Sequence, residues 1–301
     1  MWNSILLCVA TEKGLQALDA ALAFTDSVQL HVCTHRETNV SQSFTRPILE
    51  LATESGLSLV RWSEFLRDPI AFIDEREIEA LLCIGWHYLV PDSVVKHLEG
   101  RVFVAHDSLL PRLRGFAPLP TALLTGESHT GVTFLRVGKG VDDGDILWQQ
   151  EVAIKAGDSI GDLIHRITPL YRNGTEQLLR GELCESRPQD AAQATYSIWR
   201  DELDYVIDWE DTAEMIELAV RALGEPYLGA RTRWRDKTMV IHQAELVDDV
   251  RFAIRQPGKV WQLDAEGRPT VVCGEGLLRV LQATVDGKSV LPMHSLRVRL
   301  G

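Results

Sequence analysis

VFVAHDSLLPRLRGF, residues 102–116, passes from an apolar run through His106 into a polar turn that carries two arginines. Residues in the interior of a strand are not expected to change from apolar to polar in this way. Residues at the carboxyl edge of a parallel sheet are, because open α/β sheets carry their binding and catalytic residues there. The stretch therefore predicts a strand over residues 101–106 that ends at the functional edge of a parallel sheet.

The residues before this stretch alternate between strand-like and helix-like patterns. Residues 14–24 and 46–56 have the apolar spacing of amphipathic helices. Alternation of this kind favours a doubly wound, mostly parallel sheet. No GxGxxG motif follows the first apolar run, so a conventional dinucleotide site is not supported. The expected strands are residues 4–10, 28–34, 57–62 and 80–86.

The pattern changes in the second part of the chain. Short strands with tight turns, which are typical of a small β-barrel, follow residue 237. Before them come two strands (131–137 and 145–154), a long helix (159–183), a polar stretch (184–195) and a second helix (211–223). We expect a catalytic α/β domain over 1–190, a linker over 191–210, and a C-terminal domain over 211–301 with a helix and an OB-like barrel.

Charge and cysteine content narrow the class of protein. The net charge is −12, and residues 200–301 contain 14 Lys and Arg against 17 Asp and Glu, so we expect no nucleic-acid partner. The basic stretch 230–237 is interpreted as a solvated face. Five scattered cysteines without a CxxC pair indicate reduced thiols, a cytoplasmic protein and no metal site. No apolar run reaches membrane-spanning length, and we expect no membrane partner.

Two strand ends carry candidate chemistry, His106 and the stretch VDDGDIL at residues 141–147. A histidine whose partner carboxylate lies far along the chain but close in the fold is an arrangement for general acid–base catalysis. Each feature alone has a plainer explanation. A histidine at a strand end is more often structural, and an Asp-Asp-Gly-Asp sequence is more often a turn.

The two features in order resemble the signature of the folate-dependent formyltransferases. This family includes methionyl-tRNA formyltransferase, glycinamide ribonucleotide transformylase and sugar-nucleotide N-formyltransferases. Residues 83–91 are similar to the strand and loop that hold folate in the family, and the likeness covers nearly the whole chain. The matching elements are His106, SLLP at 108–111, RG at 114–115, Pro118, GE at 126–127, TGVT at 130–133 and DxGDI at 142–146.

The resemblance implies formyl transfer from 10-formyltetrahydrofolate to a primary amine. It assigns catalysis to His106, which would stabilise an oxyanion and relay protons, and to Asp142, which would orient His106 from 142 − 106 = 36 residues further along. The implied folate-binding residues are Trp86, His87, Tyr88, Leu89, Val90, Val137, Gly138, Lys139 and Asp142. The implied acceptor-binding residues are Ser108, Leu109, Leu110, Pro111, Arg114 and Gly115.

One position departs from the family pattern. The family asparagine falls on Val104, which cannot donate a hydrogen bond to an oxyanion. Loss of one such donor typically costs about 10²–10³ in rate. Backbone N–H groups or His87 are candidate substitutes. We expect a small-molecule acceptor, in particular a nucleotide-linked amino sugar. The alternatives are a methionyl-tRNA formyltransferase and a catalytically weak relative that binds folate or a nucleotide. A homodimer is left open.

Overall fold

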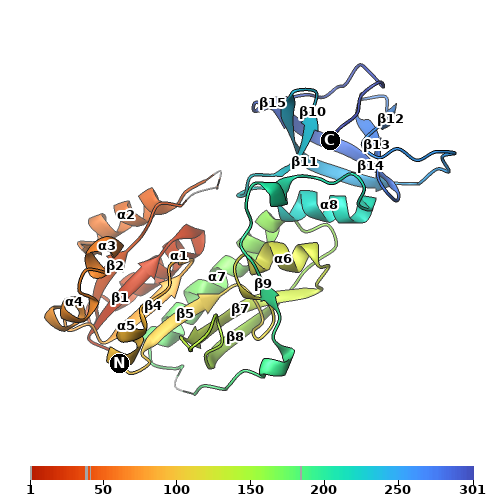
Figure 1. Cartoon of the computed structure of the whole chain (residues 1–301). Coiled ribbons are helices and arrows are strands. Elements are labelled where there is room, and N and C mark those ends of the chain that lie inside the picture. The colour runs from red at the N-terminus through yellow and green to blue at the C-terminus, as the bar shows by residue number, and fades with distance from the viewer. Residues whose placement is uncertain (1, 38–39, 41, 184) are drawn as a thin grey trace. The chain divides into compact units, whose positions relative to one another are not determined.

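The computed structural model describes residues 2–37, 40, 42–183 and 185–301, which form two compact units (Figure 1). Each unit contains its own β-sheet. Unit 1 is made of Met1–Pro118, His129–Ala153 and Ile164–Ile198. Unit 2 is made of Leu119–Ser128, Ile154–Leu163 and Trp199–Gly301. The expected division of the chain at residues 190 and 210 stays a prediction.

A seven-stranded sheet in the order β3-β2-β1-β4-β5-β7-β8 forms the centre of unit 1. The five strands from β3 to β5 pair in parallel, and β7 and β8 add an antiparallel edge. The mostly parallel sheet is therefore confirmed. Its strands are β1 (Ser4–Val9), β2 (Gln29–Cys33), β3 (Ser58–Val60), β4 (Ala80–Ile84), β5 (Val102–His106), β7 (His129–Arg136) and β8 (Ile146–Ala153).

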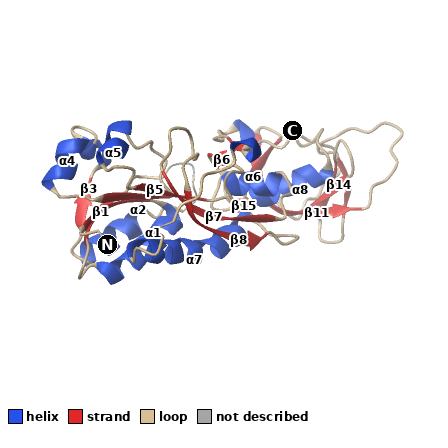
Figure 2. Ribbon diagram, turned by 90° about the horizontal axis from the view of Figure 1, so that it is seen from below, coloured by secondary structure: helices blue, strands red, loops and turns tan. Residues whose placement is uncertain are grey.

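Helices cover both faces of this sheet. Figure 2 shows α4 and α5 on one face and α1, α2 and α7 on the other. The central strands β1 and β4 are buried along their whole length, as expected for parallel strands covered on both sides. The helices are α1 (Thr11–Ala21), α2 (Thr45–Glu54), α3 (Trp62–Phe65), α4 (Pro69–Glu75), α5 (Asp92–His97) and α7 (Ile160–Leu179), with the 3₁₀ turn η1 (Leu22–Phe24).

The strand expected over residues 57–62 is shorter than its apolar pattern indicates. Strand β3 ends at Val60, and Trp62 begins α3. The rings of Trp62 and Phe65 stack with their centroids 4.9 Å apart, and both side chains are buried in the core. An aromatic pair packed at helical spacing therefore replaces the last residues of the strand.

Residues 187–198 of unit 1 are paired with the site region. Ile146 and Arg187 form an antiparallel bridge. Further on, β9 (Tyr196–Ser197) pairs in parallel with β6 (Arg114–Gly115). The 3₁₀ turn η2 (Ala191–Gln193) lies between these two pairings. Cys184 lies outside the described residues.

Unit 2 is built on a separate antiparallel sheet in the order β10-β11-β14-β13-β12, with β15 paired to β14. Residues 299 and 300 form isolated bridges to Lys259 and Trp234, so the last residues pair at both edges of this sheet. The antiparallel C-terminal sheet is confirmed, and the OB-like barrel stays a prediction. The elements are α6 (Pro118–Leu124), η3 (Leu203–Tyr205), α8 (Ala213–Ala222), β10 (Ala230–Trp234), β11 (Lys237–Val247), β12 (Val260–Leu263), β13 (Pro269–Val272), β14 (Leu277–Val285) and β15 (Lys288–Ser289).

Among the described residues, no helix combines the length and the apolar character that crossing a membrane would require.

Replacement of Gly174 in α7 by alanine is expected to lower the free energy of unfolding. The new Cβ atom would lie 2.3 Å from a ring carbon of Phe134, which is fully buried and has no room to move. Overpacking of this kind costs about 1–3 kcal/mol. The gain of alanine over glycine inside a helix offsets about 0.5–1 kcal/mol of that cost. Urea denaturation measures the difference.

Gly161→Ala in the same helix is the matched control. The nearest atom to a Cβ there, the carbonyl oxygen of Glu225, lies at an ordinary 3.4 Å. We expect the stability of this variant to be unchanged or raised. Equal losses in the two variants would contradict the role given to Phe134.

Candidate active site

His106 ends β5 and is held through both nitrogens of its ring. Its side chain lies on the same face of the strand as Val102 and Val104, because side chains alternate along a strand. Nε2 lies 2.8 Å from the carbonyl oxygen of Leu113. A carbonyl only accepts, so Nε2 carries the hydrogen of this bond. Nδ1 is therefore the nitrogen that faces the carboxylate of Asp142, at 3.5 Å.

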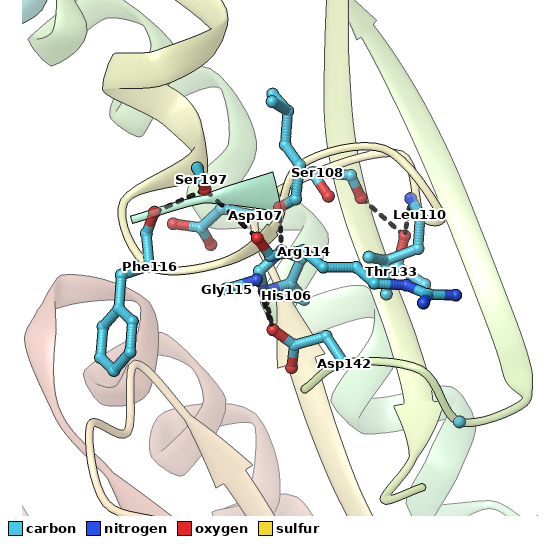
Figure 3. A network of polar contacts seen from close by, with 12 residues as sticks. His106, Asp107, Ser108, Leu110, Arg114, Gly115, Phe116, Thr133, Asp142 and Ser197 are labelled. Carbon is cyan, nitrogen blue, oxygen red and sulfur yellow. Dashed lines mark hydrogen bonds and ion pairs between the residues drawn. The ribbon is translucent and has the colours of Figure 1, made fainter. Parts of the chain in front are cut away.

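Asp142 reaches His106 from a tight turn before β8. Its backbone has a positive φ of 48°, a conformation that aspartate adopts more readily than most residues. The Oδ2 atom accepts a hydrogen bond from the N–H of Gly115 at 2.9 Å. The same oxygen is the one nearest to His106. Figure 3 shows the carboxylate turned toward both groups. One oxygen therefore ties the turn to β6 and to the histidine.

Gly115 is required by the close approach of β6 and β9. Its φ is +96°, and a Cβ atom there would lie 2.5 Å from the carbonyl oxygen of Ser197. The Ser197 hydroxyl in turn donates to the carbonyl of Phe116 at 2.5 Å. A side chain at position 115 would therefore force apart the two strands that present the N–H group to Asp142.

The SLLP segment is held by Thr133 of β7. The Thr133 hydroxyl donates to the carbonyl of Ser108 at 2.6 Å and accepts from the N–H of Leu110 at 3.3 Å (Figure 3). Ser108, which is fully buried, donates its own hydroxyl hydrogen to the carbonyl of Arg112 at 2.7 Å. These polar groups are therefore occupied by protein partners. Acceptor contacts at the segment stay a prediction.

A second polar cluster, which was not predicted from the sequence, lies on the opposite face of the sheet. Asp107 accepts hydrogen bonds from the Lys13 ammonium and from the Tyr171 hydroxyl. Lys13 comes from α1 and Tyr171 from α7, and both side chains are buried. They give no sequence signal, because each is a single residue on a helix. Asp107 could have been suspected from its place directly after His106.

Aromatic rings gather at the carboxyl ends of β2, β3 and β4. The ring of Trp86 lies within 5.6 Å, centroid to centroid, of the rings of His35, Trp62 and Tyr88. The indole nitrogen of Trp86 is buried and has no hydrogen-bond partner among the described residues. This cluster lies in the region of a topological switch point, because the chain turns from β3 back to β4 beside β1.

The residues expected to bind folate fall into two groups. Trp86, Val90 and Val137 are partly buried and pack against one apolar core, which Val104 of β5 also contacts. The structure thus brings the 86–90 loop and the start of the 137–142 turn to one apolar cluster. The exposed members are His87, Tyr88, Leu89 and Lys139. Val104 also packs against a smaller cluster of Leu110, Leu135 and Ile146.

Two histidines near these strand ends are held in the neutral form. Burial, together with a smaller contribution from the neighbouring His87, lowers the pKa of His35 to about 4. Partial desolvation of the imidazole by its neighbours also lowers the pKa of His87, with a contribution from Lys13. Glu37 and Asp107 act in the opposite direction on His87. Both rings are therefore uncharged near pH 7 and carry one N–H donor each.

The segment of residues 138–145 also contains the two other aspartates of the motif. Asp143 closes the turn, because its Oδ2 atom accepts from the N–H of Gly140 at 3.0 Å. Asp145 accepts from the hydroxyl of Ser186 at 3.3 Å. Asp142 is the one that lies beside His106. A buried imidazole beside a carboxylate can take up and release a proton in place, which is the chemistry of an acid–base pair.

The chain matches two family models. Residues 5–177 match the model described as formyl transferase, and residues 201–298 match the model described as formyl transferase, C-terminal domain. Among curated proteins, the methionyl-tRNA formyltransferase of Caldanaerobacter subterraneus subsp. tengcongensis is 29% identical over 248 residues. This match covers 80% of the chain and 78% of that relative.

Two solved structures are similar over almost their whole length. WlaRD, a sugar 3N-formyl transferase crystallised with dTDP and 5-N-formyl-THF, has a TM-score of 0.65 and 16% identity. The match covers 95% of this chain and 98% of WlaRD. An N-formyltransferase from Helicobacter canadensis, in complex with folinic acid and dTDP-3-aminofucose, also has a TM-score of 0.65 and 16% identity, over 93% and 99% of the two chains.

The free energy of unfolding is expected to fall when the pH is lowered below 6.5. The pKa values of His35, His87 and the buried His31 are lowered from 6.5 in the folded chain, in each case mainly by burial. The unfolded chain therefore binds protons first. The stability that the neutral rings contribute is complete above pH 6.5, and for His35 it is lost between pH 6.5 and about 4. Each such ring removes up to about 1.4 kcal/mol per pH unit within its window.

His31→Leu tests the assignment by urea denaturation between pH 8 and pH 5. Neither ring nitrogen of His31 has a hydrogen-bond partner among the described residues. Leucine removes this unpaired group, so we expect higher stability at pH 8 and a shallower loss on acidification. Parallel curves for the two proteins would show that His31 does not contribute to acid sensitivity.

Proposed function

The chain belongs to the formyltransferase family and is a folate-dependent N-formyltransferase, and we propose that its acceptor is the primary amine of a small molecule, a nucleotide-linked amino sugar. The observation that best supports catalysis by this chain is the placement of His106 beside Asp142. The two residues lie 36 positions apart in the chain, and their side chains meet at 3.5 Å.

The charge of the C-terminal unit favours a small acceptor over tRNA. Residues 200–301 carry three more acidic than basic residues, 17 against 14. Many of the basic side chains are also neutralised locally. Lys237 pairs with Asp286 at 2.7 Å, and Arg279 pairs with Glu245 at 2.8 Å. Further pairs join Arg221 to Glu217, Arg255 to Asp249 and Arg268 to Asp264. Binding of tRNA needs unpaired positive charge directed at phosphates.

Methionyl-tRNA formyltransferase is the second candidate, because curated relatives carry that name at 28–29% identity. The two sugar N-formyltransferases are similar in fold over nearly their full length. This likeness is one of fold, so the charge of the C-terminal unit is the main reason for placing the amino sugar first.

The strand-end region has the chemistry that 10-formyltetrahydrofolate would require. A flat pterin ring needs an apolar slot with a few fixed hydrogen-bonding groups. Trp86, Val90 and Val137 supply partly buried apolar surface on one cluster. The buried indole N–H of Trp86, which has no hydrogen-bond partner in the described part of the chain, supplies a donor there. When bound, this folate supplies the formyl group for transfer.

We assign the proton chemistry to His106. Its place between the Leu113 carbonyl and Asp142 fixes the ring plane. In this position the imidazole can stabilise negative charge that develops nearby and return a proton to a leaving nitrogen. Val104 supplies no donor. Neutral His87 and backbone N–H groups are the candidates for donating a hydrogen bond to the oxyanion.

The compartment and assembly state are part of the proposal. Cys8, Cys33, Cys83 and Cys273 are free buried thiols, which suits a reducing cytoplasm. A homodimer stays a prediction.

Given 10-formyltetrahydrofolate, the purified chain is expected to formylate a nucleotide-linked amino sugar and to leave initiator methionyl-tRNA unmodified. Mass spectrometry of the sugar nucleotide and acid-gel analysis of the tRNA measure the two products. A reaction without formyl donor is the control. Formylation of the tRNA, or tight tRNA binding that falls steeply with salt, would replace the amino sugar with the second candidate.

His106→Ala is expected to lower kcat by about 10²–10⁴, the usual contribution of acid–base catalysis. Asp142→Asn is a milder variant, because the amide oxygen still accepts from Gly115 N–H while the charge that acts on His106 is lost. Thermal melting checks that both variants are folded. A His106→Ala variant that keeps more than a tenth of the wild-type kcat would contradict the assignment.

Val104→Asn is expected to change kcat less than tenfold, or to lower it. Val104 packs between two apolar clusters, where a new amide would be left without partners at a cost of about 1–3 kcal/mol. Val104→Thr, which is nearly isosteric, controls for bulk. Steady-state kinetics at saturating folate decide the point. A gain of tenfold or more in the asparagine variant would show that the site lacks a donor that asparagine restores.

A further inference from the structure

Gln189 connects the two segments of the site that hold His106. It lies in the polar stretch of residues 184–195, between the bridge at Arg187 and strand β9. Its amide is directed at Arg114 on one side and at the turn of Asp142 on the other. No resemblance or sequence pattern pointed to this residue.

The amide of Gln189 uses its full hydrogen-bonding capacity. The Oε1 atom accepts from Nε and Nη2 of Arg114 at 3.1 Å and 2.8 Å. The Nε2 atom donates to the backbone carbonyls of Asp142 and Gly144 at 2.8 Å and 2.7 Å. A primary amide offers two N–H donors and one oxygen with two lone pairs. All four bonds are therefore made, and the amide has a single orientation.

Neutralising the charge of Arg114 does not explain why residue 189 is a glutamine. Arg114 is only 4% exposed. Besides Gln189, it is directed at the hydroxyl of Tyr196, at 3.4 Å. Among residues 2–37, 40, 42–183 and 185–301 it has no carboxylate partner. A buried cation is normally paired with an acid, and glutamate at position 189 would supply one. Glutamate would also place carboxylate oxygens against two carbonyls. The donors toward Asp142 and Gly144 are therefore the reason for an amide.

These two carbonyls belong to the turn that aims Asp142. The turn holds a non-glycine residue at positive φ, a conformation that persists only when its surroundings fix it. Gln189 holds the carbonyl of Asp142, and Gly115 N–H holds its carboxylate. Gly115 directly follows Arg114, which is the other partner of Gln189. The carbonyl and the carboxylate of Asp142 are thus both connected to the backbone segment Arg114–Gly115, the first through Gln189 and the second directly.

We propose that Gln189 is a positioning residue that sets the carboxylate of Asp142 against Nδ1 of His106. It touches neither reactant and acts through Asp142 alone. The inference rests on the proposed function, because it assumes that His106 and Asp142 carry out the proton chemistry.

Gln189→Glu separates the two halves of this arrangement. The variant keeps an acceptor for Arg114 and adds an ion pair, so the melting temperature should stay within a few degrees of the wild type. It loses both donors to the turn. We expect kcat to fall by about ten- to hundredfold, the scale of a small misplacement of a catalytic group. The KM values for folate and amine should change less than threefold.

A double-mutant cycle tests whether the effect passes through Asp142. In the Asp142→Asn background, Gln189→Glu should lower kcat by less than a further twofold, because the carboxylate that it aims is already gone. Gln193→Glu is the matched control in the same segment, since the Gln193 side chain donates to the nearby Asp190 at 2.7 Å and to no group of the Asp142 turn among the described residues. It should leave kcat unchanged. Gln189→Met, which lacks all four bonds, serves as the second variant if glutamate prevents folding.

The outcomes separate this inference from the proposed function. A wild-type chain that does not transfer formyl groups refutes the proposed function. An active wild type with a Gln189→Glu variant of unchanged kcat refutes the inference. So does an equal loss in the wild-type and Asp142→Asn backgrounds, because the residue then acts elsewhere. Failure of both the glutamate and the methionine variant to fold would also overturn it, since Gln189 would then support the fold and not the aim of Asp142.

Discussion

Two consecutive side chains at the end of β5 point to opposite faces of the sheet, and the site depends on both being held. His106 lies on the face of Val104, and Asp107 lies on the face covered by α1 and α7. Asp107 accepts from Lys13 and Tyr171, two buried partners on different helices. Charge-assisted bonds of this kind are short and strong, and breaking a buried one leaves an uncompensated charge. These bonds fix the backbone at the end of β5, so the side chain of His106 is held on the opposite face of the sheet.

The second half of the site is fixed by backbone contacts. Gly115 allows β6 to approach Ser197 more closely than any side chain would permit, and its N–H group then receives the Asp142 carboxylate. The polar segment that carries Gln189 pairs with both β6 and the start of β8. Hydrogen bonds that involve many main-chain atoms therefore connect three segments that are far apart in the chain. These segments are β6, the turn before β8 and the polar segment that carries Gln189. Such an arrangement holds a carboxylate at a defined distance without a large core beneath it.

The fold could be predicted where a local pattern and the tertiary environment agree. The runs at residues 4–10 and 80–86 are apolar throughout, and the structure buries them between two layers of helices. The pattern failed at residue 62, because an apolar aromatic residue fits a strand and a buried helical turn equally well. The pairing of His106 with Asp142 was predicted only through the order and spacing of a family motif. Gln189 and Lys13 could not be predicted, since their partners are backbone atoms or single residues on other elements.

The sequence by itself determined the alternation of strands and helices in the first half of the chain, the mostly parallel sheet, the family, and the two residues that meet beside Gly115. These follow from hydrophobic periodicity and from a motif with fixed spacing, and both are properties of the chain read in one dimension. Only the tertiary structure decided which nitrogen of His106 faces Asp142, that Arg114 is buried against an amide, and that Asp107 is anchored on the far face. Each of these depends on the distance between atoms brought together by folding, and no local pattern of residues encodes such a distance.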